Sequence, residues 1–327
     1  MFYKNARIFT PDFRFRTGAF EVRDGLFGEV LPENVPADAV DLNGATVIPG
    51  LIDVHSHGNS GADFSDGDYE GLKRMAAFYA KCGVTSFAPA SMTLPYDVLS
   101  KAFGAAKRLK EEAPAGLARL MGIQMEGPFF SEKKKGAQNG AYLRDPDFEA
   151  FQALEEGCGG LIRIVDVAPE LPGSVEFIEK AKALCTVSVA HTDASYDEAK
   201  AAFDAGATHV THLYNAMTPM HHRKPGVVTA ALRSNVYTEM ICDTIHVHPA
   251  MFQFVMDCKT NDRFVLITDC MRAGGMPQGE YTLGELKVVV DQNSARLIDG
   301  TLAGSILSLN RAIANVRATT DKPLWGI

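Results

Sequence analysis

The chain has 327 residues, of which 46% are hydrophobic and 22% charged, and this composition excludes disordered and fibrous proteins. The formal net charge is −8. It argues against a surface that follows a polyanion, because such a surface requires an excess of Lys and Arg. We therefore expect no nucleic-acid partner, and any phosphate must be bound locally.

The six cysteines are scattered without a CxxC pair, and a chain of this size does not depend on disulfides. The N-terminus lacks the apolar core of a signal peptide, and no run approaches the ~20 apolar residues of a membrane span. These features predict a soluble, cytoplasmic protein without membrane contact.

Residues 1–46 contain short β-type stretches and turn residues but no helical period, which predicts part of a small β domain. Residues 47–327 then alternate short apolar runs with amphipathic segments, as parallel β/α units do. The expected strands are 45–54, 83–90, 120–126, 161–168, 186–190, 208–213, 239–243 and 263–269.

Eight such units predict a (β/α)₈ TIM-like barrel, although a doubly wound sheet would give similar local patterns. A closed ring is favoured because polar candidate ligands follow strands one, three, five, six and eight. Expected helices include 69–82, 95–112, 174–184, 196–205, 249–258 and 301–319. Residues 276–300 predict a β-hairpin inserted after strand eight.

His55 and His57 stand at positions i and i+2 at the end of the first strand, so both imidazoles can reach one ion. Taken alone, they could equally be polar loop residues.

Glu126 ends strand three, where an unpaired carboxylate would be costly to bury. That position suits a ligand that bridges two cations, and a capping or salt-bridged glutamate is the alternative.

His191 and His212 follow β-type runs and can supply a second ion, whereas His209 is expected to be a packed or hydrogen-bonded side chain. Asp269 follows the last strand directly. An aspartate near a metal-activated water can take its proton and return it to a leaving amine. On its own, Asp269 would be better explained as a helix N-cap.

The segments GLIDVHSHG, MEGPFFSEKKKGAQ, VSVAHTDASYDEA, THLYNAMTPMHHRKPG, ICDTIHVHP, VLITDCM and DGTLAGSILSLNRAI resemble, in order, the motifs of N-acetylglucosamine-6-phosphate deacetylases. These belong to the amidohydrolase superfamily. The resemblance implies a barrel with a small β-sandwich domain. Because family members usually continue for several dozen residues, it also implies that the C-terminal strands of the sandwich are missing here.

The resemblance implies two adjacent metal sites. Glu126, His191 and His212 correspond to the common site, and His55 and His57, with bridging Glu126 and nearby Asp269, correspond to the second. We expect one or two divalent cations per subunit. The candidates are zinc, iron, manganese and cobalt, and zinc is preferred among them. No lysine stands at the Glu126 position, which argues against the carbamylated-lysine branch.

The resemblance also implies a site for an amino-sugar phosphate and a homodimer whose neighbouring subunit contributes to the phosphate site. Asn215, Ala216 and Arg223 correspond to the phosphate-binding elements, although the cluster around Arg223 could also be a solvated loop. The other implied substrate-binding residues are Gln138 at the acetamide, His246 at the sugar, and Ala303, Gly304 and Ser305 at the closure of the sugar pocket.

The implied reaction is metal-dependent deacetylation of N-acetylglucosamine 6-phosphate to glucosamine 6-phosphate and acetate. A metal-bound hydroxide would be the nucleophile and Asp269 the general base and acid. Two alternatives remain. The chain could be an amidohydrolase for a different N-acyl or cyclic amide, or a truncated, non-catalytic sugar-phosphate-binding protein.

Overall fold

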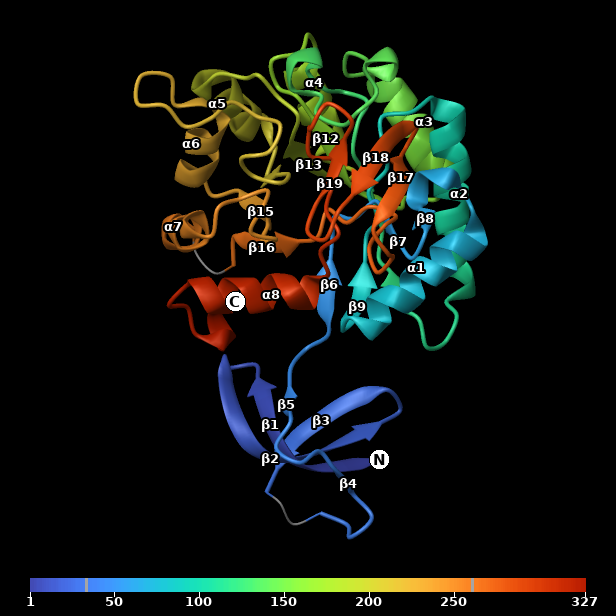
Figure 1. Cartoon of the computed structure of the whole chain (residues 1–327), viewed down its shortest axis with the longest axis vertical. Helices are drawn as coiled ribbons and strands as arrows, with labels where there is room; N and C mark the ends of the chain where they lie inside the picture. Colours follow the sequence, from blue (N-terminus) through green and yellow to red (C-terminus); the bar gives the residue numbers. More distant parts are fainter. Residues whose placement is uncertain (33–34, 260–261) are drawn as a thin grey trace. The chain divides into compact units, whose positions relative to one another are not determined.

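The computed structural model describes residues 1–32, 35–259 and 262–327 (Figure 1). The chain forms two compact units: residues 1–50 with 322–327, and residues 51–321. Among the described residues, no helix is long and apolar enough to span a lipid bilayer.

The smaller unit is built on a five-stranded sheet in the order β3-β2-β1-β4, with β5 parallel to β1. Ala6, Ile8 and Phe20 form its buried core, because alternate residues of β1 point to one face. The strand bounds are β1 Phe2–Thr10, β2 Arg14–Arg23, β3 Leu26–Leu31, β4 Val40–Asp41 and β5 Thr46–Val47; a 3₁₀ helix, η4, covers Leu324–Gly326.

The larger unit is organised around parallel strands, six of which form one sheet in the order β11-β12-β13-β14-β15-β16. A second parallel sheet has the order β10-β9-β6. The bounds are β6 Leu51–Asp53, β9 Val84–Phe87, β10 Arg119–Leu120, β11 Ile123–Met125, β12 Ile162–Val167, β13 Thr186–Val189, β14 His209–Val210, β15 Tyr237–Ile241 and β16 Phe264–Ile267.

Backbone hydrogen bonds join these two sheets into a ring. On one side, Ser91 N donates to Gln124 O at 3.0 Å and links the β9 end to β11. On the other, Asp269 N donates to His55 O at 2.9 Å and links the β16 end to β6. Thr268 Oγ1 also donates to Asp53 Oδ2 at 2.6 Å across this seam. The ring confirms the prediction of a TIM-like (β/α)₈ barrel.

Helices surround the strands in Figure 1. Several begin at an acidic or hydroxyl side chain, as at Ser195, which accepts from Glu198 N in a capping box before α5. The bounds are α1 Tyr69–Lys81, α2 Tyr96–Glu112, α3 Phe148–Gly157, α4 Ser174–Ala181, α5 Tyr196–Ala205, α6 Gly226–Arg233, α7 Ala250–Cys258 and α8 Leu309–Thr319, with 3₁₀ helices η1 Phe64–Asp66, η2 Glu132–Lys134 and η3 Gly140–Tyr142.

Residues 276–300 contain three antiparallel strands: β17 Gly279–Leu283, β18 Leu286–Val290 and β19 Ala295–Leu297. A small two-stranded sheet, β7 Gly58–Asn59 with β8 Ala62–Asp63, follows the first barrel strand.

Four predicted elements differ clearly from the structure. The predicted hairpin over 276–300 has a third strand, β19, paired with β18. The predicted strand 45–54 divides into β5 and β6, which pair with different sheets. The third barrel strand divides at Gly122, where a Cβ atom would lie 2.1 Å from the Arg163 side chain. The helix predicted over 301–319 begins only at Leu309, because Leu302 and Ser305 make β-bridges instead.

Candidate metal centre

Four polar side chains follow the barrel strands at the same offset. His55, His191, His212 and Asp269 each stand two residues after the last residue of a strand, and Glu126 directly follows β11. His191, His212 and Asp269 have left-handed backbone conformations, with φ of 43°, 34° and 49°. Such conformations are costly for residues other than glycine and tend to occur at functional sites. Here they turn the side chains into the mouth of the barrel.

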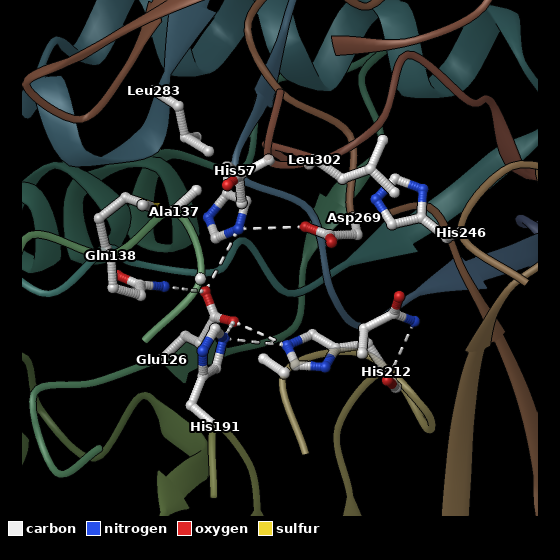
Figure 2. A pocket seen from close by; sticks show the side chains of 16 residues that line it. His57, Glu126, Ala137, Gln138, His191, His212, His246, Asp269, Leu283 and Leu302 are labelled. Carbon is white, nitrogen blue, oxygen red and sulfur yellow. Dashed lines mark hydrogen bonds and ion pairs between the residues drawn. The ribbon is translucent and has the colours of Figure 1, made fainter. Parts of the chain in front are cut away.

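Glu126 lies at the centre of the group, and Figure 2 shows the imidazoles of His57, His191 and His212 pointing toward its carboxylate. Its Oε1 lies 3.0 Å from His191 Nε2 and 3.1 Å from His212 Nε2. Its Oε2 lies 3.2 Å from His57 Nε2. The carboxylate thus faces two sets of histidines at once.

Asp269 closes the other side of the first histidine pair. Its Oδ1 lies 3.1 Å from His57 Nε2 and 3.6 Å from His55 Nε2. His55 Nε2 is also 3.7 Å from Glu126 Oε1. All of these side chains are buried.

In three of the histidine rings, Nδ1 donates a hydrogen bond to an acceptor, and this bond places the ring proton on Nδ1. Nδ1 of His191 donates to the carbonyl oxygen of Lys134 at 2.9 Å, and Nδ1 of His57 donates to that of Ala90 at 3.2 Å. Nδ1 of His55 donates to Glu239 Oε2 at 3.2 Å. In a neutral ring, these bonds leave a lone pair on each Nε2, directed at the centre.

The donor set fits a divalent cation. Among the described residues, His55 Nε2 and Asp269 Oδ1 are buried without a hydrogen-bond partner. His191 Nε2 and His212 Nε2 face each other at 3.2 Å. Two groups have their ligand atoms within 4.8 Å of one another and could each hold an ion: His55, His57 and Glu126; and Glu126, His191 and His212. Imidazole nitrogen and carboxylate oxygen suit zinc and related metals.

Electrostatics within the group agree with a site for positive charge. Burial alone lowers the pKa of His57, but Glu126 and Asp269 outweigh burial and raise it. Burial alone raises the pKa of Glu126, but His57 and His55 outweigh burial and hold it well below its usual value. The carboxylates therefore remain ionised, and their negative charge stabilises either protonated histidines or a bound cation.

A cavity of about 210 Å³ opens beside these side chains. Most of the sequence-predicted site residues line it: His57, Glu126, Gln138, His191, His212, Asn215, Ala216, His246, Asp269 and Gly304. His55 is fully buried beneath them.

Gln138 is engaged at both ends of its amide. Its Nε2 donates to Glu126 Oε2 at 2.9 Å, and its Oε1 accepts from Thr93 N at 2.7 Å. His246 is likewise oriented, because its Nδ1 lies 2.6 Å from Asp243 Oδ2. That bond leaves Nε2 of a neutral His246 ring as an acceptor.

Three predicted substrate-binding residues do not line the cavity. Arg223 lies in an exposed loop, with its Nη1 2.6 Å from Nε2 of the neighbouring His222. Ala303 is fully buried, and its N donates to Ala295 O at 3.0 Å. Ser305 supports the site from behind, since its Oγ donates to Thr268 O at 2.6 Å and its N to Asp269 O at 2.7 Å.

Two segments that carry cavity residues are joined by one carboxylate. Asn139 Nδ2 donates to Glu285 Oε2 at 2.9 Å, and the Tyr142 hydroxyl donates to Glu285 Oε1 at 3.4 Å. Glu285 lies in the turn between β17 and β18, two residues after the cavity residue Leu283. The loop that bears Gln138 is thereby held against the β17–β18 hairpin.

Sequence reasoning missed the residues that support the ligand candidates. Glu239 accepts from His55, and Asp53 accepts from Thr268 beneath them. A carboxylate directly before the apolar run 240–242 was the available signal for Glu239, and it resembles the signal for Glu126, a carboxylate at the end of an apolar run.

Comparison with known proteins places the chain in a family. Residues 46–292 match the amidohydrolase family model. An N-acetylglucosamine-6-phosphate deacetylase from Bacillus subtilis (strain 168) is 38% identical over 97% of this chain and 82% of its own length. An N-acetylgalactosamine-6-phosphate deacetylase from Escherichia coli O157:H7 is 34% identical over 95% of this chain and 82% of its own length.

Solved structures support the same family. A mutant N-acetyl-D-glucosamine-6-phosphate deacetylase from Mycobacterium smegmatis, in complex with N-acetyl-D-glucosamine-6-phosphate, matches with a TM-score of 0.93 at 32% identity. The match covers 100% of this chain and 87% of that one. The chain therefore belongs to the amidohydrolase family and, within it, to the family of the N-acetylglucosamine-6-phosphate deacetylases.

Proposed function

We propose that this protein is a cation-dependent deacetylase that hydrolyses N-acetylglucosamine 6-phosphate to glucosamine 6-phosphate and acetate. The observation that carries the proposal is the convergence of ligand-type side chains from five barrel strands on one cavity. The names of the related proteins supply the substrate class.

Glu126, His191 and His212 would hold one cation, and His55 and His57, with Glu126 and Asp269, a second. Zinc fits this mixture of nitrogen and oxygen ligands best. When bound, such a cation supplies Lewis acidity toward the amide carbonyl and toward a water molecule.

Asp269 is the proposed proton carrier. Burial alone raises the pKa of its carboxyl, but the neighbouring imidazoles of His57 and His55 outweigh burial and lower it. Asp269 is therefore ionised at neutral pH and can accept a proton from the attacking water. It then returns that proton to the nitrogen of the departing amine.

The remaining cavity residues orient the sugar phosphate. Nε2 of His246 accepts from a sugar hydroxyl, while Asn215 and the backbone at Ala216 hold the phosphate. Gln138 holds Glu126 in place and closes the acetamide side.

Arg223 lies outside the cavity of its own chain, and we assign it to the phosphate site of the second subunit in a homodimer.

The six free thiols, all in the described part of the chain, suit a reducing compartment, which supports a cytoplasmic location.

The C4 epimer of the substrate is a second candidate, because one relative of comparable similarity carries the name N-acetylgalactosamine-6-phosphate deacetylase. That enzyme would use the same ligand residues. Only the contacts to the sugar hydroxyls would distinguish the two substrates.

The test compares kcat/KM for N-acetylglucosamine 6-phosphate, N-acetylgalactosamine 6-phosphate and unphosphorylated N-acetylglucosamine. We expect the first to be preferred. We expect loss of the phosphate to reduce kcat/KM by at least about 100-fold, because each charge-assisted hydrogen bond contributes about 1.5–3 kcal/mol. Equal values with and without phosphate would contradict the phosphate site. Preference for the galacto epimer would establish the second candidate. Lack of turnover by cation-loaded protein would support the non-catalytic alternative.

A further inference from the structure

Glu239 is a fully buried carboxylate at the centre of β15, outside both groups of ligand atoms that could hold an ion. Its Oε2 accepts from His55 Nδ1 at 3.2 Å and from His212 N at 3.2 Å. Its Oε1 accepts from His209 Nε2 at 2.9 Å. One carboxylate thus reaches a ligand candidate from each group.

The bond to Glu239 determines where the proton of His55 resides. A carboxylate can only accept, so Nδ1 of His55 must carry the hydrogen. In a neutral ring, Nε2 is then left with its lone pair, between Glu126 Oε1 at 3.7 Å and Asp269 Oδ1 at 3.6 Å. Without this acceptor, His55 could place its proton on Nε2 and donate it to one of those carboxylates, which would prevent Nε2 from binding a cation.

We infer that Glu239 is a positioning residue that fixes the orientation and the tautomer of His55 for cation binding. The inference rests on the cation site of the proposed function and adds a residue that acts through His55 without touching substrate or cation. Removal of an outer carboxylate that supports a histidine ligand typically weakens metal binding 10- to 100-fold.

Asp166 provides a comparison within the same barrel. It is also a fully buried carboxylate on a central strand, β12. Its hydrogen bonds come from Gln124 Nε2 and Thr211 Oγ1, and among the described residues no side chain of the metal centre donates to it. A change at Asp166 therefore perturbs a buried acid without altering a bond to a histidine ring.

The experiment titrates Co²⁺ into chelator-treated protein and records both the calorimetric affinity and the visible absorption of the bound ion. Glu239→Leu removes the acceptor, and we expect its affinity at the His55 site to fall about 10- to 100-fold. Glu239→Gln keeps one oxygen, which can still accept from His55, so its affinity should lie between those of Glu239→Leu and the unmodified protein. This second variant is informative even if the leucine variant does not fold.

Asp166→Asn is the matched control and should bind Co²⁺ as the unmodified protein does. A double-mutant cycle adds a stricter test: in a His55→Gln background, Glu239→Gln should cause no further loss of affinity. Unchanged affinity and absorption in both Glu239 variants would overturn this inference but not the proposed function. A loss of Co²⁺ affinity in Asp166→Asn equal to that in the Glu239 variants would have the same consequence. Failure of the unmodified protein to bind Co²⁺ would overturn the proposed function as well.

Discussion

At the scale of single residues, the position of Asp269 accounts for its proposed role. Its left-handed backbone conformation is supported on both sides, because its N donates to His55 O and its O accepts from Ser305 N. The side chain is therefore held at the seam of the barrel, with Oδ1 3.1 Å from His57 Nε2. A carboxylate fixed in this way can exchange protons without a change in its position.

Asp269→Asn should lower kcat by at least about 100-fold, since a positioned general base contributes roughly 10²–10⁴-fold. An asparagine keeps one oxygen, so metal analysis should show the cation content of the unmodified protein. Asp291→Asn, in the exposed turn between β18 and β19, is the control and should retain full activity. Near-normal turnover by Asp269→Asn would refute its assignment as the proton carrier.

The candidate ligands could be predicted at this scale because each stands just after an apolar run. Their supporting residues could not. Glu239 depends on contacts with His55, just after β6, and with His209 in β14, which are far away in the sequence, and local patterns carry no such information. Gln138 was expected at the acetamide, but no pattern shows that its amide also bonds Glu126 and Thr93.

At the scale of elements, the strands were easier to predict than their ends. The apolar runs identified the barrel strands, since buried parallel strands are apolar on both faces. The start of α8 was predicted eight residues early because residues 301–308 carry only one local signal against a helix, Gly304. Their β-bridges to Arg296 and Cys270 are tertiary contacts.

The interior of β12 provides a pH test. Burial, with repulsion from Glu126 and Glu239, raises the pKa of Asp166 from its ordinary 3.8 to about 8. The folded state therefore binds this proton more tightly than the unfolded state. The stabilisation that comes from this tighter proton binding is fully present below the pKa of Asp166 in the unfolded state. It is lost as the pH rises toward the pKa of Asp166 in the folded state.

Asp166→Asn removes this titration because asparagine is neutral throughout. We expect the unfolding free energy of the variant, relative to that of the unmodified protein, to increase from pH 5 to pH 8. Urea unfolding of chelator-treated protein at both pH values measures this difference. The same difference at the two pH values would contradict the raised pKa.

At the scale of the whole molecule, closure of the ring produces the site. Strands one, three, five, six and eight supply its ligand candidates, and only a closed arrangement brings their ends to one cavity. The order of apolar runs, together with the polar ligand candidates that follow five of them, was sufficient to predict this class of fold. The hydrogen bonds between His55, Asp53, Thr268 and Asp269 that close the ring required the structure.

The central claim is that these side chains hold a divalent cation on which amide hydrolysis depends. The most direct measurement is a Zn²⁺ titration of chelator-treated protein in which bound zinc per chain and the rate of acetate release from N-acetylglucosamine 6-phosphate are determined on the same samples. We expect negligible release without zinc and a rate that rises with bound zinc until one or two ions per chain are present. Full activity in protein that contains no cation would contradict the claim.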